Sequence, residues 1–255
     1  MLGAIIGDVI GSRFEAYNKK TTDFKLFTEK SIFTDDSVLT VAVADCLINN
    51  KSYTNVFQEY GRKYPNAGYG GTFYKWIFSK NPQPYNSWGN GSAMRVSPVA
   101  YAFNDLEEVL KEAKRSAEVT HNHPEGIKGA QAIAAAVFLA RKNKTKSDIK
   151  DYIQTKFGYN LERKLDDIRP VYRFDVSCQG SVPESIIAFF ESTDFESAVR
   201  LAISIGGDSD TIAAMAGSIA EAFYKEIPLE MINETKKRLP NAFLEIIKQF
   251  QGFIR

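Results

Sequence analysis

Two short acidic clusters, far apart in the sequence, carry the side chains best suited to chemistry. The first, Thr-Asp-Asp-Ser, occupies residues 34–37, and the second, Gly-Gly-Asp-Ser-Asp-Thr, occupies residues 206–211. Each stands directly before a stretch with the apolar character of a buried helix. Asp, Ser and Thr are favoured at helix starts because their oxygens accept hydrogen bonds from unpaired backbone N–H groups. Capping alone is therefore one explanation for either cluster.

Metal binding is the other explanation, because the clusters hold more oxygen ligands than a cap requires. A cap uses one acceptor, whereas each cluster supplies two carboxylates and two hydroxyls. The helices that follow are nearly uncharged, so the clusters are expected at the mouth of an apolar core. Carboxylates there repel one another unless a cation neutralises them, and magnesium prefers such oxygen ligands. Two clusters that face each other would form a two-metal site with a water or substrate oxygen between the ions.

A glycine-rich loop, Ser-Trp-Gly-Asn-Gly-Ser at residues 87–92, is a candidate ligand-binding segment. Glycines leave the backbone accessible, and a turn of this kind at the start of a helix offers N–H groups to a phosphate. The alternative is an ordinary Asn-Gly turn beside a packed Trp88. Arg95, one helical turn further on, could contact a phosphate or pair with one of the aspartates.

Four further polar residues are candidates whose sequence context is ambiguous. Glu15 stands near the start of a loop rich in Lys and Thr, where a solvated carboxylate is the ordinary interpretation. His121 and His123 form a His-x-His pair, but no nearby Cys or His completes a zinc site. His123 is expected to cap a helix that has Pro124 in its first turn. Asp8 could orient a ligand from behind or cap a turn, so it is not among the predicted ligands.

Helical periodicity dominates the elements that must position these residues. Helices are predicted over residues 35–48, 91–103, 106–119, 125–141, 184–191, 195–205 and 210–224. Residues 38–44, 130–140 and 212–222 carry small apolar side chains on nearly all sides. A helix without a wide polar face is usually central and buried, and these three helices are therefore predicted to form the core.

Local signals refine the helix starts and the fold class. Capping boxes are predicted for Asn104 with Glu107 and for Ser181 with Glu184. Residues 171–182 alternate weakly and predict a short hairpin or an extended loop. The βαβ rhythm of a nucleotide-binding sheet is missing, so the predicted fold class is all-α. No repeat or linker divides the sequence, and one domain is predicted over residues 1–255.

The composition excludes several classes of function. The chain has 32 Lys and Arg residues against 31 Asp and Glu residues, and this balance argues against general electrostatic binding of nucleic acid. No run approaches the roughly 18 apolar residues needed to span a bilayer, and the N-terminus lacks the basic region of a signal peptide. Cys46 and Cys178 lie in apolar surroundings and are expected to be reduced, structural thiols. A cytoplasmic monomer without membrane contact is predicted.

Five motifs, in order along the chain, resemble those of the ADP-ribosylglycohydrolase family. They are residues 3–11 followed by Glu15, residues 34–36, residues 87–95, residues 119–121 and residues 207–211. The resemblance extends over most of the chain, from Gly3 to Tyr224. It implies an all-α, orthogonally packed fold with a binuclear magnesium or manganese site between helices.

The resemblance also implies roles for individual residues. The two metal ions would be held by Thr34, Asp35, Asp36, Asp208, Asp210 and Thr211. The catalytic carboxylates would be Glu15, Asp35 and Asp36. Ligand binding would fall to Trp88, Gly89, Asn90, Gly91, Ser92 and His121. By this likeness the Trp88 ring would stack on adenine and the loop backbone would hold the diphosphate.

The implied activity is metal-dependent hydrolysis of the glycosidic bond at C1″ of an ADP-ribosyl group, through an oxocarbenium-like transition state. The substrate would be an ADP-ribosylated protein or another ADP-ribosyl conjugate, and its leaving side could be arginine, serine, a nucleobase or a small ester. Two other functions stay open: a metal-dependent phosphohydrolase or pyrophosphatase, and a non-catalytic ADP-ribose-binding protein. All six metal positions carry oxygen-bearing side chains, which favours an enzyme.

Overall fold

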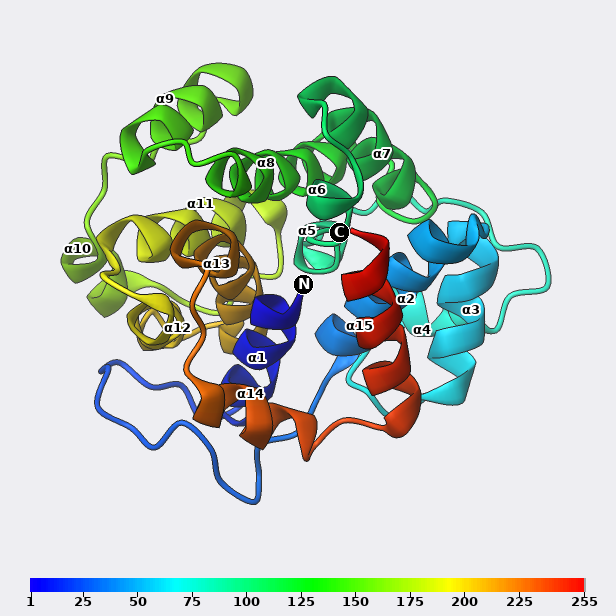
Figure 1. Cartoon of the computed structure of the whole chain (residues 1–255), viewed down its shortest axis with the longest axis horizontal. Coiled ribbons are helices and arrows are strands. Elements are labelled where there is room, and N and C mark those ends of the chain that lie inside the picture. The colour runs from blue at the N-terminus through cyan, green and yellow to red at the C-terminus, as the bar shows by residue number, and fades with distance from the viewer. Residues whose placement is uncertain (255) are drawn as a thin grey trace.

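The fold is all-α. A computed structural model of the chain describes residues 1–254, and no strand occurs among them. The elements, which Figure 1 shows in chain order, are α1 (Leu2–Gly11), a 3₁₀ turn η1 (Ser12–Phe14), α2 (Asp35–Asn49), α3 (Tyr53–Lys63), α4 (Gly71–Ile77), α5 (Gly91–Met94), α6 (Val99–Ala102), α7 (Leu106–Glu118), α8 (Pro124–Arg141), α9 (Lys146–Phe157), α10 (Leu165–Val171), α11 (Cys178–Glu191), α12 (Phe195–Ser204), α13 (Ser209–Tyr224), α14 (Leu229–Lys236) and α15 (Asn241–Phe253). The predicted fold class is therefore confirmed.

Helices α1 and α13 lie side by side (Figure 1), and their backbones approach each other closely at the glycines of α1. Gly3, Gly7 and Gly11 recur every four residues and so share one face of α1. A Cβ atom at Gly7 would lie 2.2 Å from the carbonyl oxygen of Ala213, and one at Gly3 would lie 2.3 Å from that of Gly217. This backbone-to-backbone contact brings Asp8 on α1 to the start of α13.

Replacing Gly7 by alanine is expected to destabilise the protein by about 2–3 kcal/mol, since the added methyl group must push the two backbones apart. Urea unfolding would measure the loss. Gly252 in α15 is the matched control, because a Cβ there would meet nothing within 4 Å. The control variant Gly252→Ala should remain within about 1 kcal/mol of the unsubstituted protein. Equal stability of the Gly7→Ala variant would contradict the close approach of α1 and α13.

The three predicted core helices are α2, α8 and α13, and all three are largely buried. The predicted bounds of α2, α7, α8, α12 and α13 agree with the structure to within one residue at each end. The predicted cap of α8 is also confirmed, because the His123 side chain accepts a hydrogen bond from the Glu125 backbone N–H and Pro124 occupies the first turn.

Several local predictions were wrong. The helix predicted over residues 91–103 is two short helices, α5 and α6, separated at Pro98, which cannot donate a backbone hydrogen bond. Helix α11 begins at Cys178 and is capped by Ser177, so Ser181 and Glu184 lie inside it and form no capping box. Asp105, one residue after the predicted Asn104, caps α7.

Seven helices were missed by the sequence analysis. They are α1, α3, α4, α9, α10, α14 and α15. Helix α1 shows the reason most clearly: all of its residues are buried, so it has no polar face to reveal a helical period, and its N-cap forms no side-chain hydrogen bond. A hairpin or an extended loop was predicted for residues 171–182. Residues 172–177 are an extended loop joined to Gly89 by one isolated bridge at Ser177, whereas the prediction was wrong for Val171, which ends α10, and for residues 178–182, which begin α11.

Neither cysteine forms a disulfide. Cys46 and Cys178 are both buried as free thiols, as predicted. None of the helices within residues 1–254 combines the length and the apolar character needed to cross a membrane.

Candidate metal centre and ligand pocket

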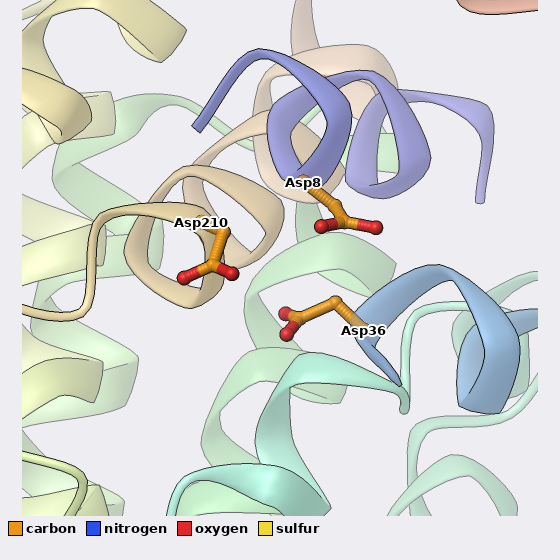
Figure 2. Close-up of side chains that lie close together, drawn as sticks. All are labelled: Asp8, Asp36 and Asp210. Carbon is orange, nitrogen blue, oxygen red and sulfur yellow. The ribbon is translucent and has the colours of Figure 1, made fainter. Parts of the chain in front are cut away.

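Helices α1, α2 and α13 bring carboxylates from three distant parts of the chain together. Figure 2 shows the side chains of Asp8, Asp36 and Asp210 converging from these helices, and one oxygen of each lies within 4.8 Å of the others. A second group within the same limit consists of Glu15, Asp208 and Asp210. Asp210 belongs to both groups. Two carboxylate groups that share one residue are the arrangement that a binuclear metal centre would require.

The capping explanation holds for the first acidic cluster and fails for the second. Thr34 caps α2, with its side-chain oxygen accepting from the Asp36 backbone N–H at 3.3 Å. Asp208 stands at the same position of α13 but forms no capping hydrogen bond. Its carboxylate instead accepts from the Asn90 side-chain amide at 2.7 Å. Asn90 therefore orients Asp208, and helix capping does not account for the acids before α13.

Asp8 was not predicted among the ligands, yet it lies at the centre of the site. Its carboxylate accepts from the backbone N–H groups of Thr34 at 3.0 Å and Ser37 at 3.1 Å, and from the hydroxyls of both residues. Burial raises the pKa of Asp8 to about 6, although these hydrogen bonds oppose the shift. Asp8 thus ties α1 to the first turn of α2. The sequence signal that could have identified it is its place among Gly3, Gly7 and Gly11, whose regular spacing indicates a helix that packs closely against a neighbour.

A hydrogen bond between the two acidic clusters fixes their relative position. The Thr211 hydroxyl donates to Asp36 Oδ2 at 3.0 Å, across 175 residues of sequence. Asp36 Oδ1 is buried and has no hydrogen-bond partner within the described chain. A buried, unpartnered carboxylate oxygen is rare unless a ligand satisfies it. A hard divalent cation would do so, and the surrounding donors are the carboxylate and hydroxyl oxygens that magnesium and manganese prefer.

The carboxylates are held without a compensating positive charge. No Lys or Arg in residues 1–254 forms an ion pair with the acids of either group. Burial, followed by the neighbouring carboxylates, raises the pKa values of Asp35, Asp36 and Asp210 well above the ordinary range. Burial and the Asp208 charge also raise the pKa of Glu15. Bound cations would reverse these shifts, because they favour the ionised carboxylates.

One pocket of about 720 Å³ joins the acids to the glycine-rich loop. The predicted site residues that line it are Glu15, Thr34, Asp35, Asp36, Trp88, Gly89, Asn90, Gly91, His121, Asp208, Asp210 and Thr211. The lining combines these acidic side chains with the Trp88 ring, which is 53% exposed. The sequence therefore identified most residues of a single pocket from five separate segments.

Two predicted positions differ from the structure. Ser92 is fully buried and does not line the pocket; its hydroxyl donates to the Gly126 carbonyl at 2.7 Å and so joins the loop to α8. Arg95 is also fully buried and pairs with neither a phosphate site nor an aspartate. Its guanidinium donates to the Ser116 carbonyl and to the Thr120 hydroxyl and lies 4.5 Å from the centre of the Phe57 ring.

An apolar part of the pocket wall was missed by the sequence analysis. Phe174 and Val176 line the pocket from the extended segment before α11. They are two residues apart, and in an extended chain such residues project to the same side. The segment is fastened to the glycine-rich loop by hydrogen bonds from the Asn90 N–H to the Val176 carbonyl at 2.7 Å and from the Cys178 N–H to the Trp88 carbonyl at 2.9 Å. Only this pairing brings the two apolar side chains to the site.

A second hollow, of about 950 Å³, lies among α12, α13 and α14. Most of its charged side chains are already paired. Arg200 binds Glu196 at 2.7 Å, Asp194 accepts from the Ser197 N–H at 2.7 Å, and Glu221 binds the N-terminal amine at 2.6 Å. Although it is the larger hollow, none of the carboxylate groups suited to a metal ion in the described residues lies in it, so the functional site is assigned to the acidic pocket.

Comparison with known proteins supports the same assignment. The ADP-ribosylglycohydrolase family model matches residues 1–252. ADP-ribosylhydrolase ARH3 of Xenopus tropicalis is 27% identical, with 90% of this chain and 87% of that protein covered. ADP-ribosylhydrolase ARH3 of Homo sapiens is 28% identical over 88% of this chain and 84% of its own length. ADP-ribosylarginine hydrolase Tri1 of Pseudomonas putida strain GB-1 is 24% identical over 88% and 69%.

A solved structure agrees in fold. A chain of an ADP-ribosylglycohydrolase-related protein complex superposes with a TM-score of 0.76 and 23% sequence identity, over 100% of this chain and 96% of that one. The all-α architecture, the paired acidic clusters at the starts of α2 and α13 and the match over residues 1–252 together place this chain in the ADP-ribosylglycohydrolase family of enzymes.

Proposed function

We propose that the chain hydrolyses the glycosidic bond at C1″ of an ADP-ribosyl group and releases ADP-ribose, with two divalent cations bound by the acidic side chains of the pocket. The observation that carries this proposal is the pair of carboxylate groups that share Asp210 within a pocket large enough for a nucleotide. The relatives named as ADP-ribosyl hydrolases support the reaction class. The cations would be magnesium, with manganese as the alternative.

The predicted ligand set fits such ions. Thr34, Asp35, Asp36, Asp208, Asp210 and Thr211 all line the pocket and would hold them, with Asp8 supporting the set from behind. When bound, the ions would supply Lewis-acid polarisation of the ribose hydroxyls and a lowered pKa for a nearby water. In this proposal the protein's part is to fix the sugar so that C1″ faces the attacking water.

The lining of the pocket offers a suitable partner for each part of ADP-ribose. The distal ribose, which carries hydroxyl groups, suits the acidic side chains. The exposed Trp88 ring would stack on the adenine. The backbone of Gly89 and Gly91 would approach the diphosphate, and His121 lines the pocket beside them.

Glu15 is the proposed group for proton transfer. The water would form a bond to C1″ as the bond from C1″ to the leaving group breaks. The water's proton would pass to the Glu15 carboxylate, and Glu15 would then give this proton to the leaving atom. Glu15 suits this role because it is the most exposed carboxylate of the two groups and its pKa is raised by burial and by Asp208.

The Glu15→Gln variant is expected to lower turnover at least about 100-fold, because amide nitrogen and oxygen cannot take the water's proton. Affinity for ADP-ribose should change little, since the side-chain size is preserved. Calorimetric titration with ADP-ribose and initial rates would separate the two effects. Glu29→Gln, an exposed carboxyl of the same inter-helix segment outside the pocket, is the matched control. Full turnover by Glu15→Gln would remove Glu15 from this role.

The reaction itself is tested by incubating the purified protein with peptides ADP-ribosylated on arginine or on serine, with magnesium or with EDTA. Mass spectrometry identifies the product. Free ADP-ribose that forms only with metal supports the proposal and identifies the preferred linkage. AMP would assign the protein as a phosphohydrolase instead. If neither peptide yields product, nucleic-acid and small-molecule ADP-ribosyl conjugates are tested in the same way.

We further propose that residues 1–255 act as one domain and as a monomer in the cytoplasm. One continuous apolar core with members from α1 to α14 supports the single domain. The two buried free thiols suit a reducing compartment. Light scattering during gel filtration would test the monomer.

A further inference from the structure

A buried series of hydrogen-bonded side chains lies next to the glycine-rich loop. It starts at Arg95, whose side chain is 0% exposed and has no carboxylate partner. Arg95 Nη2 donates to Thr120 Oγ1 at 3.0 Å, and Thr120 Oγ1 lies 2.7 Å from His121 Nδ1. The Arg95 Nε and Nη1 atoms have no hydrogen-bond partner within residues 1–254. Such an isolated guanidinium is costly to bury, and the proposed function assigns it no task.

Only one assignment of donors and acceptors along this series gives the Thr120 hydroxyl hydrogen a partner. A guanidinium has no acceptor, so Thr120 Oγ1 must accept from Arg95. The Thr120 hydroxyl hydrogen then needs an acceptor, and in the described part of the protein the only one within reach is His121 Nδ1. If Nδ1 accepts, the ring hydrogen of a neutral His121 must be on Nε2.

The Nε2 side of His121 faces the glycine-rich loop that lines the ligand pocket. His121 lines this pocket, and a Cβ atom at Gly91 would lie 3.2 Å from His121 Nε2. The ring is 5% exposed and lies near Tyr85, with 6.1 Å between ring centroids. Burial and the Arg95 charge lower the pKa of His121 well below its ordinary value, so the ring is neutral. Both effects keep a single hydrogen on the ring.

We propose that Arg95 and Thr120 are positioning residues that hold His121 in its Nε2–H tautomer, so that Nε2 donates a hydrogen bond to an oxygen of the bound ligand. The ligand part of this inference rests on the proposed function and its ADP-ribosyl substrate, whereas the tautomer does not. A fixed neutral donor adds no charge to the pocket and keeps its direction over the whole physiological pH range. The same device, in which a hydrogen bond to one ring nitrogen sets the state of the other, orients imidazoles in many functional sites.

The test compares Thr120→Val with Thr120→Ser. Valine keeps the shape of threonine but removes the hydroxyl, whereas serine keeps the hydroxyl. The full chain, labelled with ¹⁵N at histidine, is studied by nuclear magnetic resonance near neutral pH, where the two ring nitrogens report the tautomer directly. The protein has only two histidines, and the His123→Asn variant, which retains a capping acceptor for α8, assigns the signals.

The unsubstituted protein and Thr120→Ser should show His121 in the Nε2–H form, and Thr120→Val should show a mixture of tautomers. Affinity for ADP-ribose, measured by calorimetry, should fall about ten-fold in Thr120→Val and recover in Thr120→Ser. An Nδ1–H or doubly protonated His121 in the unsubstituted protein would overturn the inference. So would an unchanged tautomer in Thr120→Val, because any loss of affinity would then be structural. The Nε2–H tautomer without any binding of ADP-ribose would support the positioning of His121 by Arg95 and Thr120, and it would count against the proposed function.

Discussion

The Asp210→Asn variant should lose ADP-ribosyl hydrolase turnover by at least about 100-fold. Asp210 is the one carboxylate common to both acidic groups, so its replacement weakens two cation positions at once. Asparagine keeps the size of aspartate and one oxygen but loses the charge. Initial rates with an ADP-ribosylated peptide, over a range of magnesium concentrations, would measure the loss.

Stability separates this effect from structural damage. In the metal-free protein Asp210→Asn should raise the melting temperature at neutral pH, because it removes a carboxyl group whose ionisation is opposed by burial and by the charges of Asp208 and Asp36. Added magnesium should then stabilise the variant less than it stabilises the unsubstituted protein. Asp194→Asn, an exposed cap of α12 at which asparagine serves equally well, is the control and should change neither rate nor stability. A lower melting temperature together with normal metal affinity would contradict the bridging role.

The metal-free protein should become less stable as the pH rises from about 4 to beyond about 6. The pKa of Asp8 is raised by burial from 3.8 to about 6, and those of Asp35, Asp36 and Asp210 are raised further by burial and mutual repulsion. The folded state therefore holds protons that the unfolded chain releases at lower pH. Their stabilising contribution is complete below the unfolded pKa and is lost as the pH passes the folded values.

Divalent metal should reverse this trend, because cations bind the ionised carboxylates and compete with protons. At about 100 times its dissociation constant, magnesium should add about 2.7 kcal/mol, which raises the melting temperature by roughly 5–10 °C for a chain of this size. The gain should be large at about pH 7.5 and small at about pH 5. Thermal unfolding followed by circular dichroism, with magnesium and with EDTA at both pH values, would measure it. A metal effect of equal size at both pH values would show that the buried carboxylates are not the site.

Local sequence signals were sufficient for the helices whose ends are polar and whose interiors are not. His123 and Pro124 mark the start of α8 because a cap and a proline act within one turn. Signals of this kind failed at α11, since Ser177, Ser181 and Pro183 all lie near its start and only the tertiary pairing of residues 176–178 with the glycine-rich loop selects Ser177. Helix α1 was missed for the opposite reason, because both ends and all faces are buried.

The sequence by itself determined the fold class, the family and most of the pocket, because each of its motifs is a short run of residues whose types already suit one chemistry. The tertiary structure alone decided how these motifs meet. Asp8 joins the site only because Gly3 and Gly7 let α1 approach the backbone of α13. Arg95 is turned inward to Thr120 and away from any aspartate. A carboxylate's charge can be read from one residue, but its neighbours, its burial and hence its pKa depend on helices that are distant in the chain and adjacent only in the fold.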